Sequence, residues 1–191
     1  MQNYKLKLKN PEIRFLNDIK KVLYDKDWAK SAPNFKLYYM YRGVKEKDGL
    51  RYDVTVIPPK MLGKEFVKTK GNRNSNNFSE FYTVLQGQAL FLMQKTNGKT
   101  AKDALAIKAV RGDSVIEPAG YAIIAINPSK KTLKMGNWIS RKNKNIYKEI
   151  ETMNGACYFY TKSGWIKNKN YESVPKLRFE KPLKSMPKIW R

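Results

Sequence analysis

The feature that most constrains the fold is a series of short apolar segments between residues 37 and 140. Each segment is four to seven residues long, and Gly, Pro or Asn residues separate it from the next one. Many short strands at such spacing are typical of an antiparallel sandwich or barrel, so the sequence predicts an all-β protein. The predicted strands are residues 37–41, 52–57, 66–69, 80–85, 89–94, 104–110, 114–117, 121–127 and 134–140.

The segments on either side of this series have different patterns. Residues 4–9 alternate between apolar and basic, which predicts a half-buried strand. Residues 13–23 carry apolar side chains three and four positions apart, which predicts a short amphipathic helix. Beyond the barrel we expect a helical turn, a hairpin at Ser163 and Gly164, and a basic tail with three prolines that runs extended over another part of the protein. The predicted division is an N-terminal strand and helix extension (1–48), a barrel (49–150) and a C-terminal hairpin and basic tail (151–191).

The most specific pattern lies between residues 112 and 127. Gly112 is followed after five residues by Pro118 and then by Gly120, and Asn127 closes the segment. This spacing resembles the second motif of the cupin fold, in which a metal-binding histidine stands at the position of Ile123. The resemblance implies a jelly-roll barrel.

A second pattern lies upstream and narrows the resemblance to one family. The run Gly63-Lys64-Glu65-Phe66 leads into Thr69-Lys70-Gly71, and Glu80 is followed after six residues by Gly87. Together these residues are similar to the archaeal-type phosphoglucose isomerases, a cupin family, over roughly residues 50 to 150.

The resemblance also implies where a metal site would be. In that family three histidines and one glutamate hold a divalent ion that polarises the oxygens of a sugar. The corresponding positions of this chain, which contains no histidine, hold Asn72, Asn74, Glu80 and Ile123. An amide oxygen is a weak metal ligand and an isoleucine is not a ligand at all. We therefore interpret these four as vestigial metal positions and expect no metal, no cofactor and no catalysis.

Other matching positions keep a ligand-binding function open. By the resemblance, Thr69, Gly71 and Tyr82 lie near the sugar phosphate, and Lys68 or Lys70 would suit a phosphate group. The alternative to an inactive protein is therefore a barrel that still binds a sugar phosphate, with residual glucose-6-phosphate isomerase activity through Glu80. The same residues are also explained if they only maintain the turn and the barrel.

The charge of the chain points to a polyanionic partner. The 39 Lys and Arg residues exceed the 16 Asp and Glu residues by +23, and residues 128–191 carry 16 basic and only 4 acidic side chains. Phosphate backbones neutralise such an excess. A genome bias toward Lys, Asn and Ile codons, or adaptation to high salt, would account for part of this excess but does not remove acidic residues.

Basic residues interleaved with aromatic ones contact phosphates and stack on unpaired bases. The leading hypothesis is therefore a non-catalytic cupin re-used as a basic RNA-binding structural protein, in a ribonucleoprotein particle such as the ribosome. Three tryptophans, Trp138, Trp165 and Trp190, are candidate stacking or packing anchors. The candidate RNA-binding residues are Lys130, Lys131, Arg141, Lys142, Lys144, Lys167, Lys169, Lys176, Arg178, Lys184, Lys188 and Arg191.

The remaining sequence features place limits on the environment of the chain. Cys157 is the only cysteine, so we expect a buried thiol and a reducing compartment. No stretch approaches the roughly 18 apolar residues of a membrane span, and we expect a cytoplasmic protein without a membrane partner. Because cupin barrels often pair, a homodimer through the barrel stays open.

Overall fold

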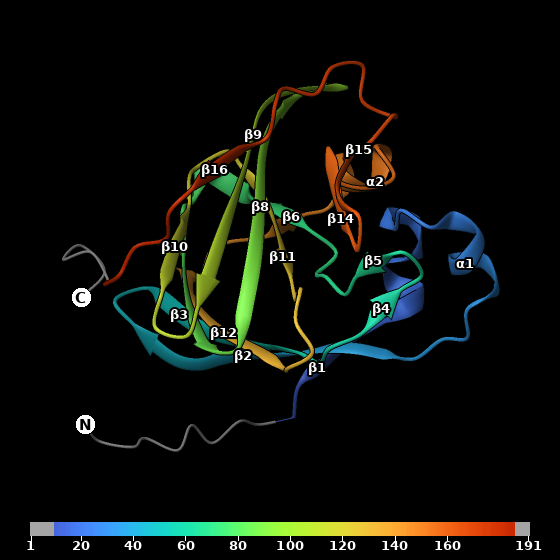
Figure 1. Cartoon of the computed structure of the whole chain (residues 1–191). Helices are drawn as coiled ribbons and strands as arrows, with labels where there is room; N and C mark the ends of the chain where they lie inside the picture. Colours follow the sequence, from blue (N-terminus) through green and yellow to red (C-terminus); the bar gives the residue numbers. More distant parts are fainter. Residues whose placement is uncertain (1–9, 186–191) are drawn as a thin grey trace.

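The structure, a computed structural model, describes residues 10–185 (Figure 1). Two six-stranded sheets form the barrel, and a smaller four-stranded sheet lies beside it. In spatial order the first sheet contains β1 (Glu12–Phe15), β2 (Lys36–Lys47), β3 (Leu50–Ile57), β12 (Leu133–Ser140), β7 (Glu80–Gln86) and β10 (Ser114–Glu117). The second contains β13 (Asn145–Ile146), β6 (Asn72–Asn74), β11 (Ala122–Ile126), β8 (Gln88–Asn97), β9 (Thr100–Val110) and β16 (Arg178–Glu180).

The remaining elements are short. The small sheet contains β15 (Gly164–Lys167), β14 (Tyr158–Thr161), β5 (Glu65–Phe66) and β4 (Met61–Leu62). The helices are α1 (Lys26–Ser31) and α2 (Lys148–Thr152), with single 3-10 turns η1 (Leu16–Asp18), η2 (Lys20–Val22) and η3 (Ser75–Asn77). Within the described residues, no helix is long and apolar enough to cross a bilayer.

The predicted strand series is present. Each strand expected between residues 37 and 140 overlaps an observed one, although 66–69 is strand only at its first residue. The predicted hairpin turn is confirmed, because Lys47 pairs with Leu50 across the two-residue turn of Asp48 and Gly49. Both turn residues have positive φ, 49° and 77°, which is the conformation that Asp-Gly turns adopt between twisted strands.

The core fills the space between the two sheets. All five residues of β11 are buried, and so are Phe81 and Phe91, which face one another's sheets from β7 and β8. Because inward side chains alternate along each strand, the polar residues at inward positions of β7 and β12 mark the one part of the interior that is not apolar. Those positions form the site described below.

The amphipathic helix expected at residues 13–23 is wrong. Residues 12–15 form β1 instead, and η1 and η2 follow, with hydrogen bonds from the Ile19 N–H to Leu16 and from the Val22 N–H to Ile19. Leu16, Ile19 and Val22 are nevertheless fully buried. A spacing of three residues also fits the 3-10 turn, which has three residues per turn, and the pattern could not distinguish the two. The one N-terminal α-helix lies at α1, where the sequence predicted a connector.

The expected division of the chain cuts across this architecture. Residue 48 lies in the hairpin that joins β2 to β3, so two strands of the first sheet come from the expected extension. The tail also joins the barrel, because β16 runs parallel to β9 and Leu183 exchanges two backbone hydrogen bonds with Ser114 of β10. The tail thus connects one edge of each large sheet. The strand expected at residues 4–9, and Lys188, Trp190 and Arg191, lie outside the described residues.

Candidate functional site

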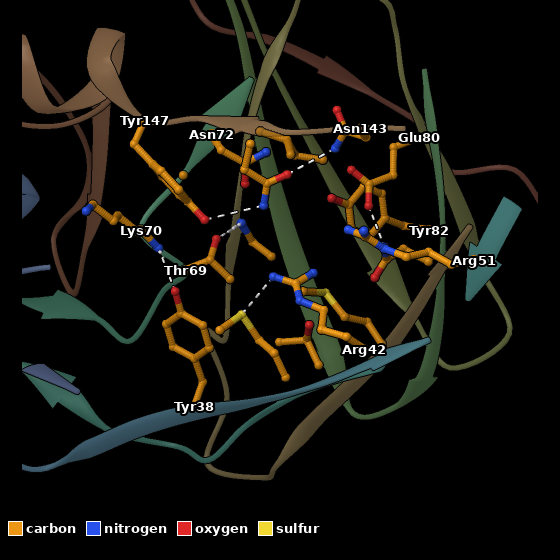
Figure 2. A pocket seen from close by; sticks show the side chains of 18 residues that line it. Tyr38, Arg42, Arg51, Thr69, Lys70, Asn72, Glu80, Tyr82, Asn143 and Tyr147 are labelled. Carbon is orange, nitrogen blue, oxygen red and sulfur yellow. Dashed lines mark hydrogen bonds between the residues drawn. The ribbon is translucent and has the colours of Figure 1, made fainter. Parts of the chain in front are cut away.

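A pocket of about 60 Å³ lies inside the barrel, between the two large sheets. Figure 2 shows its side chains converging from β2, β3, β7 and β12 on one side and from the loop before β6, β11 and the segment after β12 on the other. Three of the four expected metal positions, Asn72, Glu80 and Ile123, line this pocket, and the fourth, Asn74, lies buried directly behind Glu80.

The barrel brings the four expected positions together as the resemblance implied. Asn72 and Ile123 are direct cross-strand neighbours on β6 and β11, and Asn74 follows two residues later on the same face of β6. Glu80 approaches from the facing sheet. The geometry of the family's metal site is therefore present, and only the residue types differ.

The amides around Glu80 are turned toward it as donors. Asn74 donates to one carboxyl oxygen at 3.1 Å, and Asn137 donates to the other. The Asn74 oxygen in turn accepts from Asn143 at 2.8 Å. Burial raises the pKa of Glu80, and the hydrogen bond from Asn74 opposes that rise. This network satisfies the carboxyl group without any cation.

These residues do not fit a transition-metal ion. Both oxygens of Glu80 are engaged by amide N–H donors, the Asn74 oxygen is engaged by another amide, and the aliphatic side chain of Ile123 occupies the fourth corner. Imidazole and thiolate, the ligands that such ions prefer, are absent from the pocket lining. The described residues likewise contain no cluster of three or more Asp, Glu, Cys or His that could hold an ion.

Sequence reasoning missed a second buried carboxyl group. Glu117 of β10 pairs directly with Glu80 of β7, and one of its oxygens accepts from the same Asn74 amide at 3.3 Å. Its other oxygen is buried and has no hydrogen-bond partner. Burial, and then the adjacent Glu80, raise the pKa of Glu117 well above its usual range. Two carboxyl groups on one amide retain a proton because like charges so close cannot both ionise. Glu117 lies just before Pro118 in the cupin-like motif, but its type alone gave no signal.

Two arginines that the sequence analysis did not assign to the pocket also face it. Arg42 and Arg51 both contact the buried carboxylate of Asp53, at 2.9 and 3.1 Å. One carboxylate thus balances two guanidinium groups. Lys70 adds a third cation, which pairs with Glu151 at the rim and lies 4.9 Å from the ring of Tyr147. The pocket is therefore electropositive on the side opposite the protonated carboxyl pair.

The positions matched to the sugar phosphate have separate outcomes. Thr69, Gly71 and Tyr82 all line the pocket. Gly71 has a φ of +85°, and its α-carbon lies so close to Ile124 that a β-carbon would be 2.7 Å from that side chain. Lys68, by contrast, is buried in an ion pair with Glu65 at 2.8 Å and does not face the pocket. Of the two lysines considered for a phosphate, only Lys70 is in place.

The candidate RNA-binding residues do not form one patch with one role. Several are used within the protein: Arg178 pairs with Asp103, Lys184 with Asp113, and Arg141 with Glu46. Another, Lys167, donates to a backbone oxygen of the tail. The others in the described chain are exposed and have no carboxylate partner there, namely Lys130, Lys131, Lys142, Lys144, Lys169 and Lys176.

Three further single residues can be placed. Trp138 is half-buried and packs on Tyr52 at 4.9 Å, while Trp165 is half-buried on the small sheet. Cys157 is fully buried, and burial raises the pKa of its thiol to about 12, so it is an inert packing residue as expected.

Comparison with known proteins identifies the family. A sequence model described as "Glucose-6-phosphate isomerase (GPI)" matches residues 16–176, which is most of the chain. The chain belongs to this family. The resemblance to the cupin-type phosphoglucose isomerases is thereby confirmed, and it extends further toward both ends than the motifs indicated. No curated protein matches the sequence of this isomerase-family protein.

Solved structures share the fold of this isomerase-family protein at low sequence identity. CapF, the capsular polysaccharide assembling protein from Staphylococcus aureus, is 13% identical with a TM-score of 0.42 over 53% of this chain and 27% of the CapF chain. The Cnp3 cupin domain of Schizosaccharomyces pombe is 12% identical with a TM-score of 0.41 over 69% and 88%. The protein plu4264 from Photorhabdus luminescens is 17% identical with a TM-score of 0.40 over 55% and 76%. The fold is the all-β cupin fold expected from the sequence.

Proposed function

We propose that this isomerase-family protein binds a small anionic, hydroxyl-rich ligand such as a sugar phosphate in its barrel, without a metal ion and without catalysing isomerisation. One observation carries the proposal. The pocket presents Arg42, Arg51 and Lys70 on one side, while the position of the metal is occupied by amides bound to Glu80. Guanidinium and ammonium groups suit phosphate, and amides suit sugar hydroxyls.

The absence of catalysis follows from the same groups. The family's reaction needs a group that moves protons and a cation that polarises the sugar oxygens. Here the oxygens of Glu80 accept hydrogen bonds from two amides, and Asn143 and Asn145 stand at the rim where histidines would titrate near neutral pH. An assay for interconversion of glucose 6-phosphate and fructose 6-phosphate should give only the uncatalysed rate, with or without added divalent ions. Turnover above that rate would contradict this part of the proposal.

Calorimetric titration tests ligand binding directly. Glucose 6-phosphate, fructose 6-phosphate and inorganic phosphate are each titrated into the protein in the presence of a chelator. We expect saturable binding of a sugar phosphate that the chelator does not affect. Replacing Arg51 by alanine should weaken it at least about tenfold, because a hydrogen bond to a charged group is lost. Arg111→Ala is the matched control, since Arg111 is exposed and outside the pocket. Binding that requires added metal, or no binding at all, would overturn the proposal.

A second candidate function is RNA binding by a cytoplasmic protein within a ribonucleoprotein particle. The observation that favours it is the set of exposed lysines without carboxylate partners, which includes Lys142 and Lys144 beside a surface hollow lined by Leu50 and Phe78. Reversing the charge of Lys142 and Lys144 should weaken RNA binding and lower its salt dependence by about 0.7 to 0.9 per lost phosphate contact. Lys134→Glu, on the half-buried part of β12, controls for charge alone.

Sedimentation of a native lysate at low and moderate salt tests the particle itself. Co-migration with ribosomal particles would support the second candidate, and migration as a small free protein at every salt concentration would contradict it.

A further inference from the structure

The small four-stranded sheet presents a row of large apolar side chains, one from each strand. Met61 of β4 pairs with Phe66 of β5, and Tyr160 of β14 pairs with Trp165 of β15. The two pairs join at the centre, where the rings of Phe66 and Tyr160 stack with 5.4 Å between their centroids. The rings of Tyr160 and Trp165 lie 4.7 Å apart. We call these four side chains the aromatic row.

The aromatic row is on the outer face of the sheet. All four of its side chains are partly exposed, whereas the alternate residues, which point to the other face, include Leu62, Glu65, Phe159 and Thr161, all of them buried. That inner face is covered by the segment after η2, since the Tyr24 ring lies 5.4 Å from Phe159 and its N–H donates to Glu65. The outer face has a wall on one flank only, where Tyr158 donates to the tail at Pro175.

Lysines border the aromatic row, and no exposed carboxylate does in the two chain segments that build it. Lys64 and Lys162 lie side by side in the two turns at one end of the sheet, where the Lys162 N–H donates to the Lys64 carbonyl at 3.4 Å. Both are exposed, as are Lys60 and Lys167. A hollow of about 380 Å³ opens between the two turns. Residues 58–70 and 156–171 contain one acidic residue, Glu65, which is buried in its pair with Lys68.

We propose that the aromatic row is a binding platform for single-stranded RNA, whose bases stack on Tyr160 and Trp165 while its phosphates contact Lys64 and Lys162. Partly exposed rings on a four-stranded sheet are suited to unpaired bases, because every base has a π-face. The rim of lysines selects a polyanion over a neutral or basic protein surface. A duplex, whose bases are stacked inside, cannot use the rings. The inference rests on the second candidate function and names where the bases would lie.

Fluorescence anisotropy with a labelled oligouridine and with an RNA duplex of equal length tests this platform on the full chain. Tyr160→Leu and Trp165→Leu keep the sheet face apolar and should each weaken oligouridine binding by about 5- to 150-fold, with duplex binding unchanged. Lys64→Ala with Lys162→Ala should instead reduce the salt dependence. Trp138→Leu is the matched control, because that half-buried tryptophan lies on β12, outside the aromatic row. Trp165→Phe, which retains a ring, should restore most of the affinity lost in Trp165→Leu and shows that misfolding is not the cause.

The outcomes separate the two levels of the hypothesis. Oligouridine binding that ignores Tyr160 and Trp165 would overturn the platform and leave RNA binding by the other lysines intact. Equal losses for duplex and oligouridine would also overturn it, since only charge would then matter, and competition by a polyglutamate peptide that is as effective as RNA would favour an acidic protein partner instead. A native protein that binds neither RNA would overturn the second candidate function itself.

Discussion

Replacing Glu117 by glutamine tests whether the two buried carboxyl groups hold a proton. In the folded protein, burial and the adjacent Glu80 raise the pKa of Glu117 well above its usual value of 4.5. In the unfolded chain the same group ionises at its ordinary pKa. Between the two pKa values the native state therefore binds one more proton than the unfolded state, and the free energy of unfolding falls as the pH rises.

The magnitude follows from that one proton. Each pH unit within the window costs about 1.4 kcal/mol of unfolding free energy. For a chain of this length, 1 kcal/mol corresponds to about 2–4 °C, so the melting temperature should fall by about 3–6 °C per pH unit. Glutamine has the size of the protonated carboxyl, cannot ionise, and can donate its amide to Glu80. Glu117→Gln should therefore remove this share of the pH dependence while differing least from the native protein at low pH.

Thermal unfolding followed by circular dichroism, from about pH 5 to about pH 7, measures the slope for both proteins. Glu172→Gln is the control, because Glu172 is exposed and far from the pair in the fold. An unchanged slope in Glu117→Gln, or a loss of stability that is equal at every pH, would refute the inference that a proton is held between Glu80 and Glu117.

Three further substitutions test other features of the barrel. Restoring histidine at the three altered metal positions should create a divalent-metal site of useful affinity, measured by metal titration, and failure would count against the placement of these residues: Asn72→His, Asn74→His and Ile123→His. Lys68→Met should cost about 3–5 kcal/mol in urea unfolding because it leaves Glu65 buried and unpaired, and adding Glu65→Gln should recover most of that loss; no recovery would contradict the ion-pair account. Gly71→Ala should cost about 2 kcal/mol, since its β-carbon would overlap Ile124 at a backbone with positive φ, and a native melting temperature would refute that strain.

Much of the barrel could be predicted because the signals for strands and turns are local. The Asp48-Gly49 turn fixed a hairpin, and the glycine and proline spacings of residues 112–127 identified the cupin topology that brings Asn72 beside Ile123. The error at residues 13–23 had a physical cause, since a spacing of three fits both the helix and the 3-10 turn, and tertiary burial of Leu16 and Val22 decided between them.

The chemistry of the pocket could be predicted only where the family motif named a position. Glu117 and Asp53 act through partners that are distant in sequence, Glu80 and Arg42, and no local pattern encodes such a contact. The tail illustrates the same limit. Its proline-punctuated, basic sequence correctly indicated an extended segment lying over another part of the protein, but only the structure shows that Arg178 and Lys184 serve as internal anchors.

The tail's position has a consequence for how the protein is made. The contact between Arg178 and Asp103 joins residues 75 positions apart, so β9 and β10 emerge from the ribosome long before the segment that covers their edges. Until then each large sheet has an open edge, and open edges are where strands of neighbouring chains add on. A nascent or prematurely terminated chain of this protein should therefore be a stronger client for chaperones than the finished one.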